Sequence, residues 1–113
     1  MNILLGITGS FSAYKAPWLV RDLRRAGHDV RVVMTPSARQ FVAPLALEAT
    51  SLHPVIIDPY DPKIQEGGSW HVHLGQWADV ALIAPCSATT LAKLANGLAD
   101  SALMTVVMSM PKD

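Results

Sequence analysis

The first segment of the chain is apolar on both alternating faces, from position 2 to position 8. This pattern is typical of a parallel strand that helices cover on both sides, so a central strand is predicted at 2–8. Apolar side chains then recur at helical spacing from Ala16, with arginines between them, until Gly27 ends the predicted helix. A second strand is predicted at 29–34.

Another helix is predicted directly after this second strand. Thr35 offers a hydroxyl suited to capping, and Pro36 follows it at the first helical position, where proline is common. We expect the helix to run from Pro36 to about Val42. Pro44 is expected to break or kink it before residues 45–49 continue, because proline cannot donate a backbone hydrogen bond.

The rest of the chain continues to alternate strands with helices. A short β-branched strand is predicted at 53–58, and a loop with proline, glycine and charged residues is predicted at 59–69. The remaining predicted elements are a turn or short helix at 71–79, a strand at 80–84, a helix beginning near Ser87, and a helix or strand at 102–110. Strands that alternate with helices predict an α/β fold with a parallel, doubly wound sheet.

Length and charge limit the number of domains and the kinds of partner that the chain can have. The chain has 113 residues, of which 50% are hydrophobic, and this is enough for one compact domain. Nine basic residues balance nine acidic ones, so we expect neither nucleic acid nor a membrane surface as partner. A single cysteine fits a reducing compartment, and we recognise neither a signal peptide nor a membrane-spanning run. The expected location is the cytoplasm.

Three hydroxyl-bearing turns follow predicted strands. Gly9, Ser10 and Ser12 come after the first strand, where glycine lets backbone amides approach an anion and hydroxyls add donors. The turn lacks the third glycine of a dinucleotide fingerprint and the lysine of a P-loop, so it suits one phosphate better than a pyrophosphate. The other two turns contain Thr35 and Ser37 after the second strand, and Ala84, Pro85, Ser87 and Thr89 after a later one.

These turns are expected to meet at one edge of the sheet. The carboxyl ends of parallel strands share an edge, and open α/β sheets bind their ligands there. The alternative is that each hydroxyl only caps a helix or that the glycine only permits a tight turn. Taken together, the three turns favour a phosphorylated cofactor.

Two histidines, His71 and His73, precede the strand predicted at 80–84. Without a nearby cysteine or a dense acidic cluster they provide too few ligands for a metal, and we predict no metal site. His71 is interpreted as a proton donor or general base just ahead of the turn-bearing edge, because imidazole titrates near neutral pH. A solvent-exposed histidine without a catalytic role is the alternative.

The motifs together resemble those of the phosphopantothenoylcysteine decarboxylases, the flavoprotein part of the coenzyme A biosynthetic decarboxylase/synthetase. The matching segments are Gly-Ile-Thr-Gly-Ser-x-Ser-Ala-Tyr-Lys at 6–15, Val-Met-Thr-Pro-Ser-Ala at 33–38, His71 with Leu-Gly-x-Trp-Ala-Asp at 74–79, Ala-Pro at 84–85, and Leu-Ala-Asn-Gly-Leu-Ala-Asp at 94–100. The resemblance covers almost the whole chain.

This resemblance implies a Rossmann-like, flavodoxin-type three-layer sandwich over residues 1–113, with FMN as cofactor and His71 as the catalytic residue. It also implies a small-molecule substrate, phosphopantothenoylcysteine, which is decarboxylated to phosphopantetheine, and a homo-oligomer built from trimers with flavin between subunits. His73 stands where relatives usually have an acidic residue, and we assign it no chemistry. The implied FMN contacts are Gly9, Ser10, Ser12, Thr35, Ser37, Phe41, Ala84, Pro85, Ser87 and Thr89.

The sequence departs from the family at its carboxyl end. The family continues with a Pro-x-Met-Asn motif and a substrate flap, whereas this sequence ends at Ser-Met-Pro-Lys-Asp. We therefore expect a C-terminally incomplete domain. Two alternatives stay open: a flavin prenyltransferase of the same fold, which Pro85-Cys86-Ser87 favours, and a truncated FMN-binding protein without catalysis.

Overall fold

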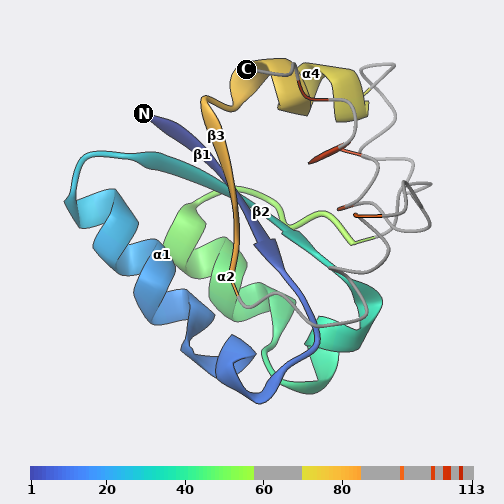
Figure 1. Ribbon diagram of the computed structural model, residues 1–113. Coiled ribbons are helices and arrows are strands. Elements are labelled where there is room, and N and C mark those ends of the chain that lie inside the picture. The colour runs from blue at the N-terminus through green and yellow to red at the C-terminus, as the bar shows by residue number, and fades with distance from the viewer. Residues whose placement is uncertain (58–69, 85–94, 96–102, 104–105, 108–109, 111–113) are drawn as a thin grey trace.

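The computed structural model describes residues 1–57, 70–84, 95, 103, 106–107 and 110 (Figure 1). The predicted loop at 59–69, the predicted helix beginning near Ser87 and most of the 102–110 segment lie outside the described residues, except that Ala95, Leu103, Val106 and Val107 are helical. Trp70 and His71 are described by their backbone alone.

The described strands form one parallel sheet. Strand β1 (Asn2–Ile7) lies in the middle, between β2 (Asp29–Met34) and β3 (Val80–Ile83), in the order β2-β1-β3. These bounds confirm the three strands predicted at 2–8, 29–34 and 80–84, with the first and third ending one residue earlier than expected. The parallel α/β class is confirmed as well.

The prediction of a strand at 53–58 is wrong over the described residues, 53–57. Only Ile56 pairs with the sheet, through an isolated parallel bridge to Val33 beside β2. The bridge consists of the Met34 N–H donating to Ile56 O at 2.9 Å and the Ile56 N–H donating to Val32 O at 3.2 Å. A β-branched segment therefore touches the sheet edge at one residue without running along it.

The first crossover contains a 3-10 helix, η1 (Phe11–Lys15), which continues into α1 (Ala16–Arg25). Gly27 follows with φ +94°, a conformation that glycine adopts without steric cost, and it ends the helical segment as predicted. The short helix expected at 71–79 is also present, as α4 (Trp70–Trp77).

The second crossover differs from the expected helix at 36–42. Residues Pro36–Gln40 form a 3-10 helix, η2, and Pro44 begins a new helix, α2 (Pro44–Ser51). The predicted break at Pro44 is confirmed, since proline is favoured in the first helical turn. The predicted capping role of Thr35 is wrong: its side chain makes no capping hydrogen bond and donates to Ile7 O of β1 at 3.4 Å.

Helices α1 and α2 cover one face of the sheet (Figure 1), and α4 contributes Leu74 to the packing on the other face, in agreement with the expected three layers. The side chains of Ile3, Leu5 and Ile7 belong to a buried cluster with residues of α1 and α2. Leu4, on the opposite face of β1, belongs to a second cluster with Leu74 of α4. Burial on both faces explains why the segment is continuously apolar instead of alternating.

A search of the described residues found no helix that is long and apolar enough to cross a membrane.

Candidate cofactor site

The register of the sheet brings the ends of the three strands to one edge. Ile7 pairs with Met34 and Gly6 pairs with Ile83, so the residues after each strand begin side by side. The pairing extends one residue further, because the Thr35 N–H donates to Ile7 O at 2.9 Å and the Ala84 N–H donates to Gly6 O at 3.0 Å. The central position of β1 makes this edge the place where strand order reverses.

The first two turns touch each other at Gly9. A Cβ atom built on Gly9 would stand 2.5 Å from Ser37 Oγ, 2.9 Å from Ser37 Cβ and 3.3 Å from the Ser37 carbonyl carbon. The first two distances are shorter than side-chain packing tolerates, so a larger residue at position 9 would push the turns apart. Gly9 is therefore required by the close approach of the second turn, and the expected convergence of these two turns is confirmed.

Small hydroxyl groups occupy the same edge. Ser10 Oγ lies 3.4 Å from Ser12 Oγ, and Thr35 Oγ1 lies 3.3 Å from Ser37 Oγ. Ser10 and Thr35 occupy the residues before η1 and η2, yet neither side chain makes a capping hydrogen bond. The alternative that these hydroxyls serve as helix caps is thus wrong for both. Thr8 differs from them, because it is fully buried beneath the edge.

Two phenylalanines stand beside the hydroxyls. Phe11, the first residue of η1, is 83% exposed, and its ring centroid lies 5.4 Å from that of Phe41 in an edge-to-face arrangement. Phe41 is half-buried and packs against the core cluster of α1 and α2. Phe41 was among the expected cofactor contacts. The contact of Phe11 with Phe41 was not predicted, because the sequence of the first turn does not indicate which ring Phe11 meets.

The third turn is described only at its start. Ala84 is half-buried and packs against the same core cluster as Phe41. The expected contacts Pro85, Ser87 and Thr89 lie outside the described residues.

The described chain anchors α4, which contains His71, away from these turns. In Figure 1 the turns after β1 and β2 lie at the lower end of the sheet, and α4 lies at the upper end. His71 is described by its backbone alone, and its role stays a prediction.

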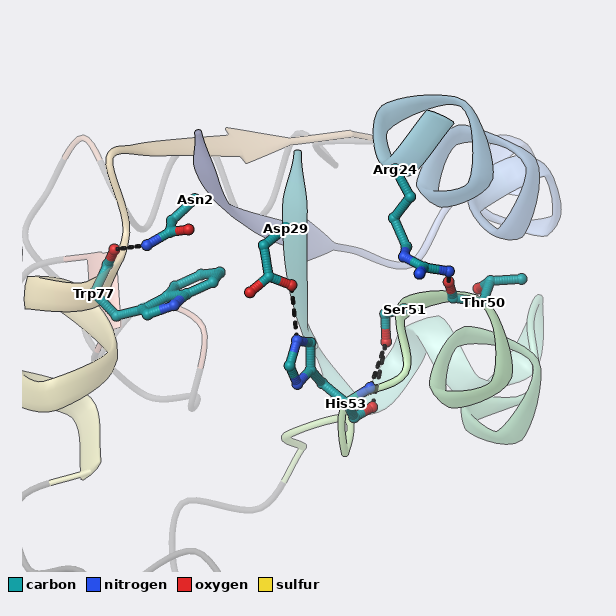
Figure 2. A network of polar contacts seen from close by, with 7 residues as sticks. All are labelled: Asn2, Arg24, Asp29, Thr50, Ser51, His53 and Trp77. Atoms are coloured by element: carbon teal, nitrogen blue, oxygen red, sulfur yellow. Dashed lines mark hydrogen bonds and ion pairs between the residues drawn. The ribbon is translucent and has the colours of Figure 1, made fainter. Parts of the chain in front are cut away.

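Polar contacts hold the carboxyl end of α4 at the amino ends of the strands. Asn2 donates its side-chain N–H to Trp77 O at 3.0 Å, as Figure 2 shows, and its backbone N–H to Asp79 Oδ2 at 2.7 Å. The Arg31 guanidinium of β2 lies 4.9 Å from the centroid of the Trp77 ring. These contacts explain why α4 lies across this edge and not at the other.

A hydrogen bond between a histidine and an aspartate at the amino end of β2 was not predicted from the sequence. His53 Nε2 lies 2.8 Å from Asp29 Oδ1 (Figure 2), and both side chains are partly exposed to solvent. Exposed pairs of this kind contribute little to stability, and this one lies away from the hydroxyl-bearing turns.

Comparison with known proteins decides the family. The whole chain, residues 1–113, matches the family described as Flavoprotein. The chain belongs to the Flavoprotein family. Membership in this family supports a flavin as the cofactor.

Three similar proteins indicate what members of this family do. The coenzyme A biosynthesis bifunctional protein CoaBC of Escherichia coli (strain K12) is 43% identical over 97% of this chain, which spans 27% of that protein. The probable phosphopantothenoylcysteine decarboxylase of Streptococcus mutans serotype c is 41% identical over 97% of the chain, which spans 61% of that protein. The structure of SpaF, an FMN-dependent cysteine decarboxylase, superimposes with a TM-score of 0.88 at 39% identity, covering 98% of this chain and 63% of SpaF.

We predict that Gly9→Ala lowers the free energy of unfolding by about 1–3 kcal/mol, the usual cost of an inserted methyl group in a packed site. The loss should shrink in a Ser37→Gly background, because both side-chain atoms that meet the new Cβ are then gone. Urea denaturation of the four proteins measures both effects.

Gly75→Ala is the matched control for this substitution. A Cβ on Gly75 would meet Met110 Cγ at 3.4 Å, an ordinary contact, and alanine favours helix formation. Its stability should stay the same or rise. An equal loss for Gly9→Ala in both Ser37 backgrounds would contradict the contact between the turns.

Proposed function

We propose that the chain binds FMN at the carboxyl edge of its sheet, with the phosphate between the first two turns. The observation that carries this proposal is the close approach of Gly9 to Ser37, which brings the first two turns, with their four hydroxyl groups, together at one edge of the sheet. Neutral donors in small turns suit a single phosphate group. The contacts expected of Gly9, Ser10, Ser12, Thr35 and Ser37 belong to this proposal.

The contacts with the ribityl chain and the ring belong to the same proposal. Phe41 and Ala84 flank the two turns on their core side, where both pack against the cluster beneath the sheet. Pro85, Ser87 and Thr89 follow Ala84 directly in the sequence. The proposal treats residues 1–113 as one FMN-binding domain.

The proposed reaction is the decarboxylation of 4'-phosphopantothenoylcysteine to 4'-phosphopantetheine, in the cytoplasm. The similarity to CoaBC and to the probable decarboxylase of Streptococcus mutans supports the substrate, and the similarity to SpaF supports FMN. FMN when bound supplies two-electron redox chemistry at the carbon that bears the thiol, which gives the departing carboxylate a route for its electrons. This activity makes the protein a carbon–carbon lyase.

His71 is the proposed catalytic residue, and we propose that it acts on a flavin held by a neighbouring copy of the chain. The hydrogen bond from Asn2, at the amino end of β1, to Trp77 O supports this, because it anchors the carboxyl end of α4 at the edge of the sheet opposite the turns. This arrangement agrees with the proposed trimer. In such a site His71 holds the substrate carboxylate or transfers a proton, a role worth about 10²- to 10⁴-fold in rate when it is acid–base catalysis.

A flavin-binding protein without turnover is the second candidate function. The chain spans 61% of the probable decarboxylase of Streptococcus mutans. Flavin binding without release of carbon dioxide from phosphopantothenoylcysteine would favour this candidate.

We predict that Ser12→Ala weakens FMN binding by about 10- to 100-fold, because a hydrogen bond to a charged group contributes about 1.5–3 kcal/mol. Titration of the apoprotein with FMN, followed by flavin fluorescence, measures the dissociation constant. Thr50→Val is the control, since the Thr50 hydroxyl donates to Ala46 O within α2 at 2.9 Å. The contact of Thr50 with Arg24 in Figure 2 is made by its backbone carbonyl oxygen, which the substitution keeps. Equal affinities for the unaltered chain and Ser12→Ala would remove the serine from the site.

We predict that His71→Asn retains FMN affinity and loses release of carbon dioxide from phosphopantothenoylcysteine by at least about 10²-fold. At an FMN concentration that loads His71→Asn chains but not Ser12→Ala chains, co-refolding the two should restore part of the activity, because mixed oligomers combine an intact histidine with an intact flavin turn. Unchanged release by His71→Asn would exclude the histidine from the mechanism. Failure of the mixture to regain activity would contradict a site shared between copies.

A further inference from the structure

The first turn is linked to the second turn at two places. Gly9 meets Ser37 on one side of Ser10, and the ring of Phe11 meets the ring of Phe41 on the other side. Ser10, which carries one of the proposed phosphate donors, therefore lies between two contacts that both reach across to the η2 segment.

The two rings differ in how they are held. Phe41 is half-buried and packs against the core cluster, so the hydrophobic core fixes its position. Phe11 is 83% exposed, and burial contributes little to fixing its ring. Edge-to-face contact at 5.4 Å is the interaction that ties Phe11 to Phe41, so support passes from the core through Phe41 to the first turn.

The first turn needs such support. Helix η1 has five residues, and Ser10 before it makes no side-chain capping hydrogen bond. A 3-10 segment of this length has poor hydrogen-bond geometry and gains little stability by itself. Ala13 is buried in the core cluster and η1 continues into α1, so the carboxyl end of η1 is held by the core. The amino end, which carries Ser10, depends on the contacts made by Gly9 and Phe11.

The geometry points to Phe11 as a positioning residue for the phosphate end of the cofactor. Its ring packs against the ring of Phe41, and this contact fixes the distance between the Ser10–Ser12 hydroxyls and the Thr35–Ser37 hydroxyls. This inference rests on the proposed FMN site. It implies that loss of the Phe11 ring weakens binding of the phosphate and leaves binding of the flavin ring itself unchanged.

Comparison of FMN with riboflavin separates these two parts of the cofactor, since riboflavin lacks the phosphate. Phe11→Ala should weaken FMN binding by about 2- to 10-fold, the range that an aromatic pair contributes, and should leave riboflavin binding unchanged. Phe11→Tyr keeps the ring edge and should retain the FMN preference of the unaltered chain, whereas Phe11→Leu keeps apolar bulk and should lose it. Leu45→Ala removes another exposed apolar side chain, in α2, and should change neither affinity.

A double-substitution cycle tests whether Phe11 acts through its contact with Phe41. Phe41→Leu should reduce the preference for FMN over riboflavin as Phe11→Ala does, and the preference of the double variant should equal that of the more affected single variant, because both changes remove the same contact. The preference is the quantity compared because Phe41 is itself a proposed contact of the ribityl chain or ring, and its loss weakens riboflavin binding too. Circular dichroism of each variant confirms that it is folded, and Phe41→Leu is chosen over Phe41→Ala because it keeps the half-buried volume.

Each possible result of these binding measurements leads to a different conclusion. Equal weakening of FMN and riboflavin by Phe11→Ala would overturn the inference and make Phe11 a direct contact of the flavin ring. No change in either affinity, or full retention of the FMN preference by Phe11→Leu, would overturn it as well. Absence of FMN binding by the unaltered chain would refute the proposed function, and the inference would fall with it because no phosphate would then occupy the turns.

Discussion

Parallel pairing of the central strand on both of its sides is the constraint on which the rest of the structure depends. Because β1 pairs with β2 from Asn2 to Ile7 and with β3 from Ile3 to Gly6, the residues that follow the strands leave the sheet together. Backbone hydrogen bonds from Thr35 to Ile7 and from Ala84 to Gly6 carry the alignment into the turns. A shift of one residue in either pairing would reverse the faces of the strand and move the turns out of alignment.

The same strand, β1, also separates the cofactor turns from α4. Its alternate side chains anchor α1 and α2 on one face and α4 on the other, so that both layers depend on one buried run of residues. The flavin turns extend from its carboxyl end, and α4 is tied to its amino end through Asn2. One chain therefore anchors α4, which contains the proposed catalytic histidine, at the end of the sheet opposite its proposed cofactor site. Assembly of several copies is the simplest way to join them.

Much of this arrangement follows from the sequence because it depends on local patterns. Continuous apolar runs identified the three strands, Gly27 identified the end of α1, and hydroxyls placed directly after apolar runs identified the first two turns. The three turns were expected to converge for a general reason, since parallel strands share a carboxyl edge. The contact between Gly9 and Ser37 agrees with that expectation for two of them.

The predictions made from the sequence were wrong where contacts between residues far apart in the sequence determine the structure. Thr35 carries a typical capping side chain, yet its hydroxyl bonds to Ile7 because β1 lies beside it. The β-branched segment around Ile56 meets the sheet at one residue, which its composition does not reveal.

The position of α4 depends on Asn2 and Arg31, which lie far from it in the sequence. The contact between Phe11 and Phe41 likewise joins two turns whose spacing is set by the sheet.

Backbone amide shifts in the NMR spectrum, recorded while FMN is added to the labelled apoprotein, test the central claim most directly. The account predicts that the amides of Gly9, Ser10 and Thr35 shift in a saturable way, and that inorganic phosphate moves the same amides in the same direction. The amides of Asn2 and Asp29, at the other end of the strands, should stay in place. Saturable shifts at Asn2 and Asp29 with none at Gly9 and Thr35 would contradict it.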